Sequence, residues 1–263
     1  MKQIIKTVHF VDNYLINPTN PVTVNLIGAG GTGSQVLSAL ARINHSLIAL
    51  NHPGLFVQVF DNDSVTTANL GRQLFAASEL GLNKAAALIN RMNRFFGTDW
   101  KAVTSMYPEK TESNRATITI SCVDTVKARF EIAETLKNIS TKNKNQNNNP
   151  LYWMDFGNSR NTGQVILSTV DNIKQPASKK YKAILSIPMI TDEFKNLLDD
   201  VKENSEPSCS LAQALTKQDL FINSSLASLG ASLLWTMFRE GMITYRGFFL
   251  NLKDFRTQPL TVK

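Results

Sequence analysis

The sequence predicts an α/β fold: a Rossmann-like, doubly wound mixed sheet with a parallel core, antiparallel additions and helices on both faces. Two observations carry this prediction. An apolar run at 22–27 leads directly into a glycine-rich loop, and a helical repeat and a second apolar run at 55–60 follow it. A strand, a helix and a strand in this order form a βαβ unit with a right-handed crossover. The 263 residues, 43% of them hydrophobic, can bury a sizeable core.

The glycine-rich loop predicts a site for a phosphate group. Its glycines are Gly28, Gly30, Gly31 and Gly33, and they contain the spacing GxGxxG. Glycine is needed where the backbone takes a positive φ or where a phosphate approaches to contact distance. The helix expected after the loop adds free N–H groups and a dipole that favour an anion. We therefore expect a nucleotide here, although the loop alone does not identify it.

The remaining elements follow from periodicity and turn residues. Residues 1–20 are expected to form an extended N-terminal arm, and residues 21–263 a single domain. Helices are expected from the loop to about residue 50 and over 84–96, 126–138, 192–201 and 221–239. Further strands are expected over 101–105, 116–121, 152–156, 164–170 and 245–252, with a turn at 157–158 and a frayed end from Pro259.

Composition narrows the class of protein. The net charge is +7, but the lysines and arginines are scattered, which favours a solvated surface plus a phosphate site over a nucleic-acid partner. Two cysteines cannot form a four-cysteine zinc site or a disulfide framework, so we expect a protein of the reducing cytoplasm without structural zinc. The N-terminus lacks the continuous apolar core of a signal peptide, and no run reaches transmembrane length.

Asp61 ends the second predicted strand, where doubly wound folds place an acid on the ribose hydroxyls. It follows Gly33 by 28 residues. The dinucleotide fingerprint has a spacing of about 20, so the longer spacing disfavours NAD without excluding it. The polar segment that begins at Asp61, DNDSVTTANLGRQLF, is unusual for a dehydrogenase and indicates a site.

Three motifs resemble the ThiF/MoeB/HesA superfamily of ubiquitin-activating-type enzymes: GAGGTGS, DNDSVTTANLGRQLF, and Gly-Leu-Asn-Lys before a helix. The resemblance covers roughly Val22 to Asp124. Longer segments, LARINHSL, ANLGRQLFAASELGLNK, NRFFGTDW and EPSCSLAQAL, are similar to the ThiF-family proteins of plasmid-borne PRTRC systems. The superfamily adenylates the C-terminus of a small ubiquitin-like or sulfur-carrier protein, and the resemblance implies this activity.

The resemblance also implies which residues bind ATP. The matching positions that contact the nucleotide are Asp61, Asn69, Arg72, Gln73 and Lys84. Adenylation requires several negative charges to be neutralised along one line, and an arginine can donate to phosphate bidentately while a lysine supplies a point charge. Asp124 directly follows the predicted strand at 116–121, where a carboxylate can hold Mg²⁺ against phosphates. The resemblance implies that Asp124 binds the metal ion, because the family has its metal-binding aspartate directly after the corresponding strand.

The two cysteines differ in their surroundings. Cys122 ends an alternating strand pattern, so we interpret it as a small buried apolar residue rather than a nucleophile. Cys209 precedes an apolar helical pattern, and thioester-forming members of the superfamily have a cysteine in a similar place. A helix N-terminus would lower the pKa of its thiol. Both a nucleophile and a structural cysteine remain open for Cys209.

Further expectations come from the family alone. These are a homodimer, a small β-grasp protein as partner, a conjugating-enzyme-like component downstream, and a mobile crossover region around 171–210. Two departures are visible: the CxxC zinc site of many members is absent, and no arginine precedes Arg42, although bacterial members often supply one from the N-terminal arm of the partner subunit.

Two alternative functions remain. A non-catalytic nucleotide-binding scaffold would account for the missing arginine. An NAD-dependent oxidoreductase is suggested by the glycine loop alone, and Arg72 and Lys84 argue against it.

Overall fold

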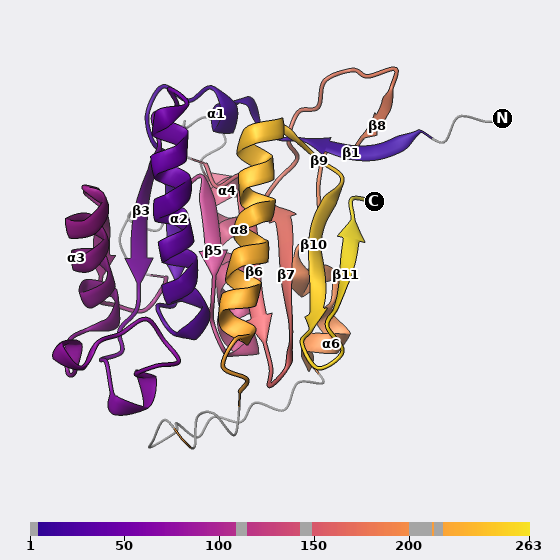
Figure 1. The fold of residues 1–263 in the computed structure, drawn as a ribbon. Coiled ribbons are helices and arrows are strands. Elements are labelled where there is room, and N and C mark those ends of the chain that lie inside the picture. The colour runs from indigo at the N-terminus through magenta and orange to yellow at the C-terminus, as the bar shows by residue number, and fades with distance from the viewer. Residues whose placement is uncertain (1–4, 109–114, 143–148, 200–211, 213–217) are drawn as a thin grey trace.

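The computed structural model describes residues 5–108, 115–142, 149–199, 212 and 218–263, and its core is one eight-stranded mixed sheet (Figure 1). The mutually parallel strands are β2 (Val22–Ile27), β3 (Leu55–Phe60), β4 (Lys101–Val103), β5 (Ile118–Ser121) and β6 (Tyr152–Asn158). The strands that continue the sheet by antiparallel pairing are β7 (Thr162–Thr169), β10 (Tyr245–Asn251) and β11 (Arg256–Thr261). The strand order is β11-β10-β7-β6-β5-β2-β3-β4, which confirms the predicted fold class.

Helices cover both faces of the sheet, as predicted. The helices on the front face in Figure 1 are α2 (Gly31–Ala49), α3 (Lys84–Phe96) and α8 (Ile222–Glu240). Those that pack on the other face are α4 (Val126–Lys142), α5 (Ile190–Glu193) and α6 (Lys195–Asp199). Two apolar clusters fill the space between helices and sheet, and the central parallel strands β2, β5 and β6 are buried along nearly their whole length. Burial on both faces explains why these strands are continuous apolar runs.

The first twenty residues, expected as an extended N-terminal arm, contain regular elements in their described part, 5–20. These are strand β1 (Lys6–Phe10) and the short helix α1 (Asn13–Ile16). Strand β1 pairs parallel with β8 (Tyr181–Ala183) and antiparallel with β9 (Met242–Ile243), and together they form a small second sheet. These partners lie far from β1 along the chain, so local sequence could not reveal the pairing.

Other boundaries are close to the predictions, with three exceptions. The turn expected at 157–158 is wrong, because β6 continues through Asn158 and the chain reverses before Thr162. The frayed end expected from Pro259 is also wrong, because Pro259 lies in β11 and pairs with Phe248 of β10. Proline is tolerated there because β11 is an edge strand, which leaves one row of backbone donors unpaired. The helix expected at 192–201 is two short helices, α5 and α6, within the described range.

The predicted crossover region, 171–210, contains β8, α5 and α6 in its described part. Cys209 lies outside the described residues. Two single-turn 3₁₀ helices, η1 (Thr67–Asn69) and η2 (Ala77–Glu79), shape the polar segment between β3 and α3. None of the helices in the described parts of the chain is both long and apolar enough to cross a membrane.

Candidate active site

A polar pocket of about 470 Å³ lies where the chain order of the parallel strands reverses. Strand β2 pairs with β3 on one side and with β5 on the other, and the loops after β2 and β5 meet at the carboxyl ends. Open α/β sheets bind ligands at such a switch point. The pocket brings together these predicted site residues: Gly28, Gly30, Gly31, Asp61, Arg72, Gln73, Lys84 and Asp124.

The glycine loop forms the floor of the pocket. Gly28 has φ +90°, and a Cβ there would lie 2.7 Å from the carbonyl oxygen of Cys122. A Cβ on Gly33 would lie only 1.8 Å from the carbonyl oxygen of Gly28, so only glycine lets α2 start this close to the loop. Gly30 is the N-cap of α2 and supplies no side-chain cap. The first N–H groups of the helix are therefore available to an anion.

Asp61 joins the end of β3 to the glycine loop. Its Oδ2 accepts a hydrogen bond from the Ala29 amide at 2.6 Å, and its Oδ1 accepts one from the Asp63 amide at 2.8 Å. Burial raises the pKa of Asp61, and the two backbone hydrogen bonds oppose that shift. Each carboxylate oxygen keeps a second lone pair for a hydroxyl donor.

Lys84 is the first residue of α3 and is only 8% exposed. The N-cap of that helix, Asn83, accepts a hydrogen bond from the Ala86 amide. The Nζ atom of Lys84 lies 2.8 Å from Oδ2 of Asp63, whose side chain is 63% exposed. Asp63 therefore holds a nearly buried ammonium group at the edge of the pocket.

Arg72 and Gln73 follow the 3₁₀ turn η1 and reach the pocket with unused polar atoms. Nη1 of Arg72 donates to Oε1 of Gln218 at 2.7 Å, and its Nε has no hydrogen-bond partner among the described residues. Burial lowers the pKa of Arg72. Gln73 is 7% exposed, and its Oε1 is likewise without a partner in the described part of the chain. Buried polar atoms without partners are costly, so both atoms are candidates for ligand contacts.

The structure does not bring Asn69 to the pocket lining. Its Oδ1 accepts hydrogen bonds from the amide and the hydroxyl of Thr66, at 2.9 and 3.1 Å. Its backbone carbonyl accepts from the amide of Gln73. Asn69 thus stabilises the turn that presents Arg72 and Gln73, and a direct nucleotide contact from Asn69 stays a prediction.

Asp124 is exposed and lines the pocket from the loop after β5. In the parts of the chain that the structure describes, no group of three His, Cys, Asp or Glu side chains is arranged to hold a metal ion. Mg²⁺ is commonly held by one or two carboxylates together with substrate phosphates, so a single carboxylate beside a phosphate pocket fits this ion.

Four pocket residues form an amide and hydroxyl network that sequence reasoning missed. Asn223, at the start of α8, accepts from Thr32 at 2.9 Å and from Asn158 at 2.6 Å, and donates to Gln218 at 3.1 Å. The carboxyl-end rule could have singled out Asn158, which ends β6. Nothing local marks Gln218 or Asn223, because the start of α8 and the residues before it reach the pocket through the packing of α8 on α2 and on the sheet.

Cys122 lines the pocket but lacks the environment of a nucleophile. Burial raises the pKa of its thiol well above the ordinary value, and the carboxylate of Asp155 adds to the shift. The thiolate is the reactive form, so the interpretation of Cys122 as a non-nucleophile agrees with its surroundings.

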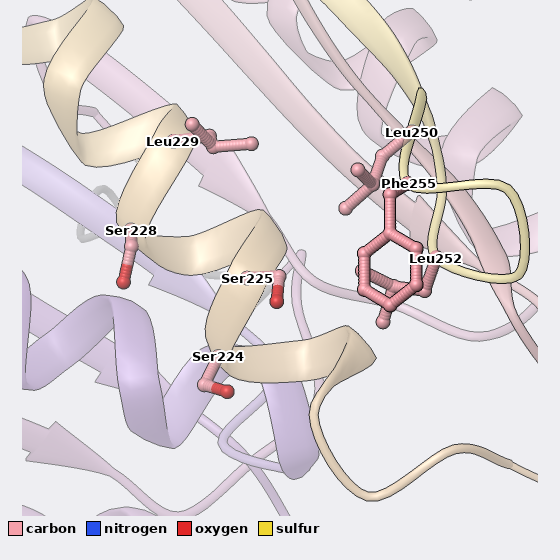
Figure 2. A pocket seen from close by; sticks show the side chains of 7 residues that line it. All are labelled: Ser224, Ser225, Ser228, Leu229, Leu250, Leu252 and Phe255. Atoms are coloured by element: carbon pink, nitrogen blue, oxygen red, sulfur yellow. The ribbon is translucent and has the colours of Figure 1, made fainter. Parts of the chain in front are cut away.

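A second pocket, of about 410 Å³, lies between α8 and the β10–β11 hairpin (Figure 2). Figure 2 shows three serine side chains on α8 and the apolar side chains of Leu250, Leu252 and Phe255 on the hairpin. The described residues that line this pocket include no charged side chain. A phosphate would find no counter-charge among these residues, so the pocket at the glycine loop is the better candidate for a nucleotide site.

Comparison with known proteins gives one family and several relatives. The model of the ThiF family matches residues 19–260. Ubiquitin-like modifier-activating enzyme 5 of Drosophila ananassae is 30% identical over 155 residues, which are 52% of this chain and 34% of that protein. The Aedes aegypti protein of the same name is 27% identical over 156 residues, 53% of this chain and 34% of its own. The chain thus spans about a third of the length of these relatives.

Solved structures share the fold at low identity. A crystal structure of selenomethionine PaaA aligns with a TM-score of 0.58 at 15% identity and covers 92% of this chain and 64% of that one. E. coli MccB with selenomethionine MccA aligns with a TM-score of 0.58 at 15% identity, over 95% of this chain and 65% of that one. MccB has also been crystallised with ATP, and that structure aligns with a TM-score of 0.53 at 15% identity, over 95% of this chain and 65% of that one.

Proposed function

Since this chain belongs to the ThiF family, we propose that it adenylates the C-terminal carboxylate of a small ubiquitin-like, β-grasp protein, with ATP and Mg²⁺. One observation carries the proposal: Arg72, Lys84 and the open N-terminus of α2 surround a single pocket that also contains the Asp61 carboxylate. Cations and amide donors on one side and a hydroxyl acceptor on the other suit a nucleoside triphosphate.

In this reaction a carboxylate oxygen of the partner attacks the α-phosphorus of ATP. The new bond is acyl oxygen to phosphorus, the bond between the α-phosphorus and the bridging oxygen breaks, and pyrophosphate leaves. Arg72 and Lys84 neutralise the charge that develops on the phosphates, and the first amides of α2 donate to them. Asp61 accepts from the ribose hydroxyls. Mg²⁺, held by Asp124 and the phosphates, would stabilise the leaving pyrophosphate.

Competition between nucleotides separates this proposal from the alternatives. We expect ATP to bind more tightly than NAD, and Lys84→Met to weaken ATP binding by about tenfold or more, because a charge-assisted hydrogen bond contributes about 1.5–3 kcal/mol. An exposed lysine on α4, Lys127→Met, is the matched control. Tighter binding of NAD would contradict the proposal and favour an oxidoreductase. ATP binding without adenylation would favour the scaffold.

A second step can be tested at Cys209: transfer of the acyl group from the adenylate to the thiol, with AMP as leaving group. The proposal rests on the resemblance in EPSCSLAQAL. Cys209→Ala should abolish a reducible adduct with the partner and spare pyrophosphate exchange, while Cys122→Ala should retain the adduct. An unchanged adduct in Cys209→Ala would remove Cys209 from the mechanism and leave it a structural residue.

Other parts of the proposal rest on the family resemblance: membership in a PRTRC-type system, a homodimer, a downstream conjugating component and a mobile crossover around 171–210. A cytoplasmic location rests on the two cysteines, and one domain over 21–263 rests on the sequence pattern.

A further inference from the structure

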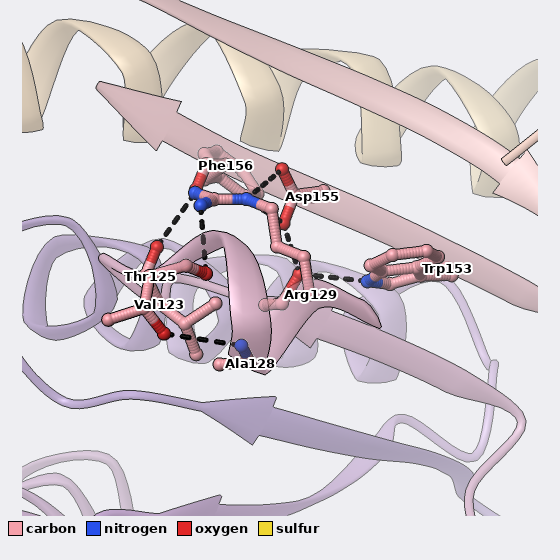
Figure 3. Close-up of polar contacts among 8 residues, drawn as sticks. Val123, Thr125, Ala128, Arg129, Trp153, Asp155 and Phe156 are labelled. Atoms are coloured by element: carbon pink, nitrogen blue, oxygen red, sulfur yellow. Dashed lines mark hydrogen bonds and ion pairs between the residues drawn. The ribbon is translucent and has the colours of Figure 1, made fainter. Parts of the chain in front are cut away.

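A buried ion pair between Arg129 and Asp155 restrains the loop that carries Asp124 (Figure 3). Arg129 lies on the first turns of α4 and is 5% exposed; Asp155 lies on β6 and is 1% exposed. Nε of Arg129 donates to both oxygens of Asp155, at 3.2 and 3.0 Å. Figure 3 shows the guanidinium lying between the strand that carries Asp155 and the loop that leads into α4.

The other nitrogens of Arg129 bind the backbone of that loop. Nη2 donates to the carbonyl oxygen of Val123 at 2.7 Å, and Nη1 donates to that of Thr125 at 3.2 Å. These two carbonyls belong to the residues on either side of Asp124. Nη2 also donates to the carbonyl of Phe156 at 3.3 Å, which ties the loop to the neighbouring strand. All three guanidinium nitrogens are therefore used.

Asp155 is fixed in turn. Its Oδ1 accepts from the hydroxyl of Ser121 at 2.6 Å, and that hydroxyl accepts from Nε1 of Trp153 at 2.8 Å. A buried ion pair costs desolvation and is often no more stabilising than apolar residues of the same volume. The ion pair does fix the local geometry, because a planar guanidinium group with five donors can hold several acceptors in place at once.

From this geometry we infer that Arg129 is a positioning residue, which holds the backbone on both sides of Asp124 so that its carboxylate faces the phosphate pocket. The inference rests on the proposed function for the meaning of Asp124, but the restraint on the loop does not depend on it. A lysine at 129 keeps the charge, but its three donors sit on one nitrogen atom, which cannot reach Asp155 and three separate carbonyls together.

The test compares Arg129→Lys with Arg246→Lys. Arg246 is also a buried arginine, 3% exposed, and it lies on β10 and pairs with Glu193, away from the phosphate pocket. Two measurements are made on the full chain: hydrogen exchange of the amides at 122–126 without ligand, and the affinity for ATP with Mg²⁺ and with EDTA. Global stability is followed by urea unfolding.

We expect Arg129→Lys to accelerate exchange at 122–126 by about tenfold or more beyond any change in global stability, and Arg246→Lys to leave that local rate unchanged. We also expect Arg129→Lys to remove most of the gain in ATP affinity that Mg²⁺ provides, while the affinity in EDTA changes less than about threefold. Asp124→Asn should remove the same gain, and the double variant should lose no more, since residues acting through one another are not additive.

Unchanged exchange at 122–126 in Arg129→Lys would overturn the inference, whatever the chain binds. An unchanged magnesium effect in Arg129→Lys, together with its loss in Asp124→Asn, would overturn it as well. If the wild type does not bind ATP at all, the proposed function fails, and the exchange rates still decide whether Arg129 restrains the loop.

Discussion

Gln218 forms a hydrogen bond with Arg72, whose guanidinium group is expected to bind the phosphates of a nucleotide. Its Oε1 accepts from Nη1 of Arg72 at 2.7 Å and also from Nδ2 of Asn223 at 3.1 Å. This side-chain oxygen therefore takes a donor of Arg72 that a phosphate oxygen would use. A nucleotide must displace Gln218 before Arg72 can bind it through that N–H group.

The first prediction concerns that exchange. Gln218→Ala should bind ATP about two- to tenfold more tightly than the wild type, because the hydrogen bond that must be broken contributes about 0.5–1.5 kcal/mol. Gln258→Ala, an exposed glutamine on β11, is the control and should bind like the wild type. Calorimetric titration measures both. Weaker binding in Gln218→Ala would show that Gln218 assists the nucleotide instead of competing with it.

His9 is a buried histidine whose two ring nitrogens both find hydrogen-bond partners in the neutral form. Its Nδ1 must donate to the carbonyl of Ile184 at 2.9 Å, so Nε2 is left to accept from the hydroxyl of Tyr152 at 3.0 Å. That hydroxyl already accepts from the Asp12 amide at 3.0 Å. Burial lowers the pKa of His9 below 6.5, and the hydrogen bond to Ile184 opposes the shift.

The second prediction follows from the direction in which the pKa of His9 moves. Between the lowered pKa and 6.5 the unfolded chain binds more protons at this site than the folded one. The contribution of His9 to stability is therefore complete above about pH 6.5 and is lost as the pH falls toward the pKa of the folded state. His9→Asn should flatten this part of the stability curve in urea unfolding at about pH 5–8. An unflattened curve, or the same flattening in the exposed control His45→Asn, would contradict this assignment.

At the scale of elements, local patterns predict the parallel core well. The apolar runs of β2 and β3 are found at the predicted residues, and so is α3. That helix begins after the Asn83 cap and is closed by its C-cap, Gly97, with φ +67°. Local patterns fail for β1, β8 and β11, because these strands depend on distant partners or on an exposed edge. A short strand with little apolar content cannot be recognised before its partner is known.

The third prediction concerns the contact between the glycine loop and α2. Gly33→Ala should lower the free energy of unfolding by about 1–3 kcal/mol, because its Cβ would lie 1.8 Å from the Gly28 carbonyl oxygen and the backbone must move. A Cβ on Gly30 would approach no described atom closer than Nε2 of Gln73, at 4.0 Å. Gly30→Ala should therefore cost about 1 kcal/mol or less, the usual effect at an N-cap. Equal losses in the two variants, measured by urea unfolding, would contradict this packing argument.

At the scale of the whole molecule, the site is assembled from segments spread over most of the chain, from Gly28 to Asn223. Most pocket residues from Gly28 to Asp124 could be predicted, since they belong to sequence motifs or directly follow predicted strands. The wall formed by Asn158, Gln218 and Asn223 could not, because it depends on the antiparallel return of the sheet and on the packing of α8 against α2. Asn69 is a different case. Its place in the motif predicts a nucleotide contact, but in the structure its side chain binds the backbone of its own turn.

The same assembly brings the parts of the proposed site together from separate connections of the sheet. The glycine loop and the Asp124 loop meet at the switch point, and the packing of Gly28 against Cys122 couples their positions. The cations arrive from the segment between β3 and α3. The proposed adenylation site thus draws its parts from three connections of one sheet.

The most direct test of that proposal is ATP–pyrophosphate exchange with the small β-grasp partner. We expect exchange that depends on Mg²⁺ and on the free C-terminal carboxylate of the partner, and that disappears when this carboxylate is amidated. Arg72→Ala should lower the rate by about 10²–10³-fold, as removal of one preorganised donor typically does, and Arg94→Ala, an exposed arginine on α3, should leave it unchanged. No exchange with the intact partner, under conditions where the chain binds ATP, would contradict the proposal.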